Sequence, residues 1–236
     1  MSAPAPEQVR AALAAQLVAR GYVLPHHGLM AAALPDLAAA YGPMYAALTL
    51  TPHHLSALER ECVWLVLLIA DGQAVGTHHL ELFLKLGGSQ AQARALLRLA
   101  AHAAGAARYA FIDGPWAPHW PGGDGAAEYL AAADALAAPL PPALIRACLA
   151  AAHALLRDGW GLRAALPAAL HAGIAEAALA EAIALTIWPG GVNRLVEAAE
   201  TWLALIREGA APASASFRVW AETPGQGPLR IPKEPA

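Results

Sequence analysis

The sequence predicts an all-α fold built from two tandem repeats of one helical unit. Apolar residues make up 58% of the 236 residues and charged residues only 14%, and much of the apolar content is alanine, the strongest helix former. Runs in which Val, Ile or Thr alternate with polar residues, which would indicate strands, are absent. A constant offset of 86 residues aligns 57–108 with 143–194 without a gap, and this self-similarity predicts the repeat.

Turn and capping residues place the expected helices along the chain. The first helix covers 6–20 and ends at Gly21, and a second helical region covers about 29–48. Thr51 and Pro52 have the residue types of an N-cap and a first helical residue, which predicts a helix to about residue 70. Ser89 is the expected N-cap of a later helix. The remaining helices are expected at 74–86, 90–104, 126–137, 142–157, 161–172, 175–187 and 191–208.

These helices group into five expected segments. The two repeats are joined by a segment whose first part, 113–125, is rich in Gly, Pro and aromatic residues. The tail holds several prolines and few apolar residues, so we expect it to be extended or disordered. The segments are N-terminal helices at 1–48, a first repeat at 49–112, a linker and helix at 113–137, a second repeat at 138–208 and the tail at 209–236.

Composition and charge argue against several classes of protein. The net charge of −3 provides no basic field for nucleic acid. The longest strongly apolar run, Val63–Ala70, is far shorter than the roughly 20 residues of a membrane span. Two cysteines and no recognisable signal peptide favour a cytoplasmic protein. The surplus of apolar residues predicts a homo-oligomer that buries part of it between subunits.

One pair of polar residues in the first repeat has the types needed for acid–base chemistry. Glu61 and His79 lie ten residues before and eight residues after the centre of the turn at 71–73, so an antiparallel helical hairpin would bring them together. A carboxylate that orients an imidazole allows proton transfer near neutral pH, and His78 is an additional candidate. The second repeat has Ala147, Ala164 and Ala165 at the aligned positions. We therefore expect one working site and one degenerate copy, although a polar pair that only packs two helices remains the alternative.

Other residues are weaker candidates. Arg60 could bind a substrate carboxylate, but Arg146 at the equivalent position also suits a structural role. Trp116, His119 and Trp120 on the 113–125 loop could form a lid over a pocket or fill a subunit interface. The adjacent histidine pairs lack metal-ligand spacing, so we expect no metal site, and His26, His27 or His53 could line a pocket or cap a helix. Both cysteines, Cys62 and Cys148, are expected to be small core residues.

The order of these motifs resembles the carboxymuconolactone decarboxylase and AhpD-like family. The resemblance rests on L-x-R-E at Leu58–Glu61, followed by an apolar helix, and on H-x-x-x-x-L-x-x-G at His79–Gly87. In the second repeat it rests on 166–173 and 174–191, which contain the Glu181-Ala182 pair and a glycine turn. It covers about 50–110 and 140–205.

This resemblance implies an AhpD-like helical bundle and assembly into a trimer of duplicated chains. Some members are thiol peroxidase components with a C-x-x-C motif before the histidine, but 72–78 contains no cysteine. The decarboxylase branch implies a cofactor-independent lyase or isomerase that acts on a small carboxylated or lactone-type metabolite, with His79 as acid–base and Glu61 orienting it. A non-catalytic helical scaffold or small-molecule binding protein is the alternative, and a thiol peroxidase-related protein is the less favoured one.

Overall fold

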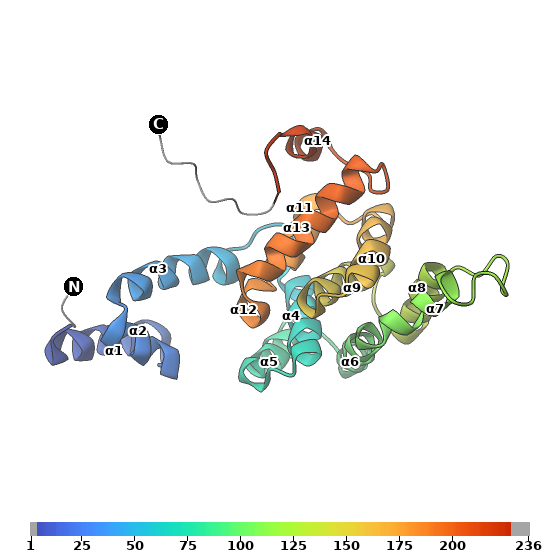
Figure 1. Ribbon diagram of the computed structural model, residues 1–236. Coiled ribbons are helices and arrows are strands. Elements are labelled where there is room, and N and C mark those ends of the chain that lie inside the picture. The colour runs from blue at the N-terminus through green and yellow to red at the C-terminus, as the bar shows by residue number, and fades with distance from the viewer. Residues whose placement is uncertain (1–3, 228–236) are drawn as a thin grey trace, which may run out of the picture. The chain divides into compact units, whose positions relative to one another are not determined.

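The computed structural model describes residues 4–227, and this part of the chain contains helices and no strand. The expected all-α class is confirmed. The chain divides into two compact units at Thr51–Pro52, whereas the sequence suggested a boundary near residue 48. Figure 1 shows the course of the helices within each unit.

The N-terminal unit contains α1 (Pro6–Arg20), α2 (Pro25–Ala33), α3 (Pro35–Tyr45) and a short π-helical turn, η1 (Ala46–Leu50). Each α-helix begins with proline, whose fixed φ suits the first helical position. Gly21 ends α1 in the left-handed region, with φ of 76°. The expected helix at 6–20 is thus confirmed. The second helical region was predicted to begin at about residue 29, but α2 begins four residues earlier, at Pro25.

The second unit opens with a hairpin of two helices. Helix α4 (Ala57–Asp71) is followed by a 3-10 turn, η2 (Ala74–Gly76), and by α5 (His78–Lys85). Gly72 ends α4 with φ of 69° and lets the chain reverse. Helix α6 (Gln90–Ala104) packs on α4 and has Ser89 as its N-cap, as predicted.

The predicted start of α4 was wrong. Thr51 and Pro52 lie in an irregular segment, and the helix begins five residues later. Ser56 is the N-cap: its side chain accepts a hydrogen bond from the backbone N–H of Glu59, and the Glu59 carboxylate accepts one from the backbone N–H of Ser56. This capping box gives hydrogen-bond acceptors to the backbone N–H groups of Ser56 and Glu59, and it therefore favours a helix that begins directly after Ser56.

Shorter elements connect the two halves of the second unit. They are η3 (Ala106–Arg108), α7 (Ala110–Asp113) and α8 (Gly125–Leu136). The segment 114–124 between α7 and α8 is a series of turns, in agreement with its glycines and prolines. Asp113 fastens this segment, because its carboxylate accepts a hydrogen bond from the backbone N–H of Gly125.

A second hairpin consists of α9 (Pro142–Leu156) and α10 (Gly159–His171), and α11 (Glu176–Ala184), α12 (Ile187–Gly190) and α13 (Val192–Arg207) follow it. Helix α9 is the centre of the unit. It packs against α4, α6, α10, α11 and α13, and its residues 147–152 are almost completely buried. Figure 1 shows α4 and α9 side by side in the middle of the unit. The alanines on α9 permit this close packing on several sides.

The tail is not extended throughout, which corrects the prediction. Residues Ala215–Glu222 form α14, whose Phe217 and Trp220 rings lie 5.0 and 6.3 Å from the ring of Trp202 on α13. Three aromatic rings bury enough apolar surface to fix a short helix. The last part of the expected tail, 228–236, lies outside the described residues.

Among the described residues, every helix is too short or too polar to cross a lipid bilayer.

Candidate functional site

The structure brings Glu61 and His79 together across the first hairpin. The Nδ1 atom of His79 lies 2.7 Å from the Oε2 atom of Glu61. Only 8% of Glu61 and 7% of His79 is exposed. Because a carboxylate only accepts hydrogen bonds, Nδ1 carries the proton of this contact. The Nε2 atom of His79 is then the ring nitrogen that can accept or deliver a proton.

Aromatic neighbours hold the His79 ring in place. The indole of Trp64, one helical turn after Glu61 on α4, stacks on the imidazole with ring centres 4.6 Å apart and planes 21° apart. The His78 ring lies 4.3 Å from the His79 ring but is itself exposed. Burial and the neighbouring His79 lower the pKa of His78. His78 therefore stands beside the pair in its neutral form near pH 7.

Trp64 was not among the sequence-predicted site residues. Its signal is the i+3 spacing from Glu61, which places both side chains on the same face of α4. The indole excludes water from one face of His79, and this makes the hydrogen bond to Glu61 stronger than it would be in solvent.

Arg60 points to a different partner. Its Nε atom donates to the Oε1 atom of Glu181 on α11 at 3.0 Å, and both side chains are at least nine-tenths buried. The Oε2 atom of Glu181 also accepts hydrogen bonds from the backbone N–H groups of His54 and Leu55, at 2.7 and 2.8 Å. In the second hairpin, Arg146 makes two hydrogen bonds to Asp134. Both arginines thus join helices, which supports the structural role for Arg60.

The remaining predicted site residues do not gather around Glu61 and His79. His53 is exposed and its ring lies 6.4 Å from that of His54, in the segment before α4. Trp116, His119 and Trp120 are exposed on the segment between α7 and α8, where the two indoles lie 6.1 Å apart. Figure 1 shows that segment at the end of the unit away from α5.

The second hairpin lacks the Glu–His pair but contains a different polar chain. Ala147 and Ala165, which lie 86 residues after Glu61 and His79 in the sequence, are completely buried. The Nε2 atom of the fully buried His153 lies 2.9 Å from the hydroxyl oxygen of Tyr129, and its Nδ1 atom lies 3.1 Å from the Oδ2 atom of Asp158. The sequence analysis did not predict these contacts of Tyr129, His153 and Asp158, although a histidine among the apolar residues of α9 was a signal for them.

The two thiols are not activated. Cys62 and Cys148 are free and buried. Burial, with Glu59 and Glu61 adding to it, raises the pKa of Cys62 to about 12. Burial also raises the pKa of Cys148 well above its ordinary value. Since the thiolate is the nucleophile, neither cysteine is prepared for redox chemistry at neutral pH.

Within residues 4–227, no group of three or more His, Cys, Asp or Glu side chains is arranged to hold a metal ion.

A scan of the sequence against protein-family models matches no family, and searches of curated proteins and of solved structures find no match. The fold and the site therefore define residues 4–227 as an all-helical structure in which Glu61 and His79 form a buried carboxylate–imidazole pair between the two helices of the first hairpin.

Proposed function

We propose that the Glu61–His79 pair is the acid–base centre of a cofactor-independent lyase or isomerase. The observation that carries the proposal is the 2.7 Å contact between His79 Nδ1 and Glu61 Oε2, made almost completely out of solvent. A carboxylate placed there accepts the hydrogen bond from Nδ1–H and fixes the ring orientation. The substrate class is a small carboxylated or lactone-type metabolite, in line with the resemblance to the carboxymuconolactone decarboxylase and AhpD-like family.

The chemistry needs one proton donor. When a carboxylate lies vinylogous to a lactone carbonyl, the C–C bond electrons move into the conjugated system as CO2 leaves. The resulting dienolate then takes a proton on carbon. The imidazolium of His79 supplies this proton from Nε2, and Glu61 holds Nδ1–H throughout. An isomerase would use the same atom twice, first to remove and then to return a proton.

The backbone conformation of one pair of aligned glycines supports the proposed tandem repeat. Gly87 and Gly173, which are 86 residues apart, have φ angles of 93° and 97°. An AhpD-like bundle of two such units is the arrangement we propose.

The proposed assembly is a homo-oligomer, with a trimer of duplicated chains as the natural form. An apolar surface on the first hairpin supports it. Leu80 on α5 and Leu97 on α6 are 39% and 52% exposed, and both line a mostly apolar cavity of about 490 Å³ beside α4. Burial of this surface between subunits would remove it from water. A cytoplasmic location is part of the same proposal.

A non-catalytic helical scaffold or binding protein is the second candidate. The observation that favours it is that Glu61–His79 and Arg60–Glu181 are both buried contacts between helices, as a packing role requires.

The two candidates differ in one measurable property. We propose to incubate the protein in D2O with a panel of carboxylated lactones and their open-chain acids, beginning with γ-carboxymuconolactone, and to follow it by proton NMR. Catalysis predicts loss of CO2 or ring isomerisation with deuterium at carbon, and E61Q should slow it about 100-fold or more. His171 is an exposed histidine on α10, so H171Q is the matched control and should keep the wild-type rate. A panel left unchanged by the wild-type protein favours the scaffold.

A further inference from the structure

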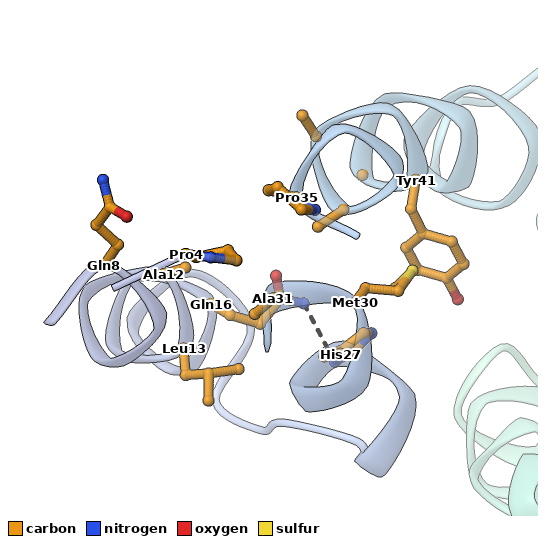
Figure 2. A pocket seen from close by; sticks show the side chains of 13 residues that line it. Pro4, Gln8, Ala12, Leu13, Gln16, His27, Met30, Ala31, Pro35 and Tyr41 are labelled. Carbon is orange, nitrogen blue, oxygen red and sulfur yellow. Dashed lines mark hydrogen bonds between the residues drawn. The ribbon is translucent and has the colours of Figure 1, made fainter. Parts of the chain in front are cut away.

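The N-terminal unit contains a cavity of its own. It has a volume of about 610 Å³ and is lined only by residues between Pro4 and Gly42. Figure 2 shows side chains of α1, α2 and α3 around it, with His27 and Met30 of α2 between Leu13 of α1 and Tyr41 of α3. This volume is in the range of pockets that enclose drug-sized molecules, about 300–1,000 Å³.

Small side chains leave the space open. Ala12 on α1, Ala31 on α2 and Ala38 on α3 line the cavity where larger residues would fill it. Within residues 4–51, only His27, Met30 and Ala31 are buried, so the unit has very little core of its own. A bound apolar molecule would supply the missing packing.

A buried histidine lines this cavity. The Nδ1 atom of His27 accepts a hydrogen bond from the backbone N–H of Leu24 at 3.1 Å and lies 3.4 Å from the amide nitrogen of Gln16. Because the backbone N–H can only donate, Nδ1 carries no proton, and the proton of the neutral ring is on Nε2. Burial, with His26 and Arg20 adding to it, lowers the pKa of His27 and keeps the ring neutral. His27 is only 6% exposed, and it lines the cavity.

The lining also selects against charge. It contains no Lys, Arg, Asp or Glu, and its polar groups are Gln8, Gln16, His27 and Tyr41. A charged ligand would lose its hydration without gaining an ionic partner. A neutral ligand with an oxygen acceptor would meet the Nε2–H of His27 at no such cost.

We propose that the N-terminal unit is a binding site for an uncharged, flat apolar molecule with a carbonyl or hydroxyl oxygen that accepts a hydrogen bond from His27. The alanines of α1 and α3 contact its faces, and Met30 adapts to its edge. This site is separate from the Glu61–His79 pair, for which we propose carboxylated substrates, so failure of either proposal leaves the other standing.

The test uses the full chain and the neutral fluorescent ketone prodan, whose emission moves to shorter wavelength in apolar surroundings. The wild-type protein should bind it in a saturable manner. A38F fills the cavity and should raise the Kd at least tenfold, or abolish binding. Ala40 lies on the same helix but is exposed and does not line the cavity, so A40F should bind within about twofold of wild type.

Matched competitors test the role of His27. The ketone 2-acetylnaphthalene should displace prodan, whereas the 2-naphthoate anion, of similar shape, should not. H27F should weaken the ketone about tenfold and leave the oxygen-free 2-ethylnaphthalene unchanged, while circular dichroism checks that the helices are retained.

Several results would overturn the proposal. These are saturable prodan binding that A38F and A40F affect equally, displacement by 2-naphthoate as strong as by the ketone, or no binding. Ala93 lines the apolar cavity between α4 and α6. If A93W lost prodan binding and A38F kept it, the binding site would be that cavity and not the one in the N-terminal unit. Concentration-dependent association of the chain that A38F abolishes, without prodan binding, would assign the cavity to a second copy instead.

Discussion

Replacing Glu181 with alanine removes the acceptor that holds the start of α4. The Glu181 carboxylate accepts hydrogen bonds from the Nε of Arg60 and from the backbone N–H groups of His54 and Leu55. E181A leaves a buried guanidinium without its carboxylate and two N–H groups without their acceptor. Breaking a buried ion pair by removal of one partner costs about 3–5 kcal/mol. In a chain of this size each 1 kcal/mol lowers Tm by about 2–4 °C, which gives a loss of roughly 6–20 °C.

Urea unfolding followed by far-ultraviolet circular dichroism measures this cost. The matched control is E208A, because Glu208 pairs with Arg163 on the surface, where both side chains are about half exposed. That variant should lose no more than about 1 kcal/mol. E181Q keeps one acceptor oxygen and should fall between the two. Equal losses in E181A and E208A would refute the idea that the Arg60–Glu181 pair fastens α4 to α11.

Three further outcomes follow from the buried polar groups. G161A should lower the free energy of unfolding by about 1–3 kcal/mol in urea titrations, since its Cβ would lie 2.3 Å from the His153 ring; G159A, with open space at that position, is the control. Burial opposes ionisation of Asp158, but the neighbouring His153 and the backbone N–H groups of Gly161 and Trp160 outweigh it and lower its pKa. The resulting stability is complete above the unfolded-state pKa of about 3.9 and is lost as pH falls through the folded pKa, so D158N should flatten the acid limb of a stability–pH curve. An aromatic disulfide reagent should label neither buried cysteine at pH 7 in the native protein and both in denaturant, and fast native labelling would contradict the raised thiol pKa values.

The sequence predicted the features that depend on short spacings. Counting residues on either side of the turn at 71–73 placed Glu61 opposite His79, because both helices rise by a fixed amount per residue. The N-cap at Ser89 and most helix bounds followed from local chemistry in the same way. The start of α4 did not follow from local chemistry alone. Thr51-Pro52 is a good local signal, but the chain before α4 is held by Glu181, more than 120 residues away.

The same limit explains the other differences. Helix α14 could not be predicted from the proline-containing tail, because it is stabilised by contacts of Phe217 and Trp220 with the Trp202 ring on α13. The partners of His153 come from α8 and from the turn before α10, and no spacing within α9 announces them. Trp116 and His119 looked like pocket residues by composition, yet their segment lies at the far end of the unit. Residue type alone does not tell which elements meet.

In the function that we propose, His79 transfers protons and does not merely pack against Glu61. The most direct measurement compares turnover and stability in H79Q on the panel of carboxylated lactones. A glutamine amide can donate to the Glu61 carboxylate but cannot give up and regain a proton near neutral pH. We expect H79Q to lose at least about 100-fold in turnover while its free energy of unfolding changes by less than about 1 kcal/mol. Wild-type turnover in H79Q, or a large loss of stability in a protein that turns over nothing, would contradict it.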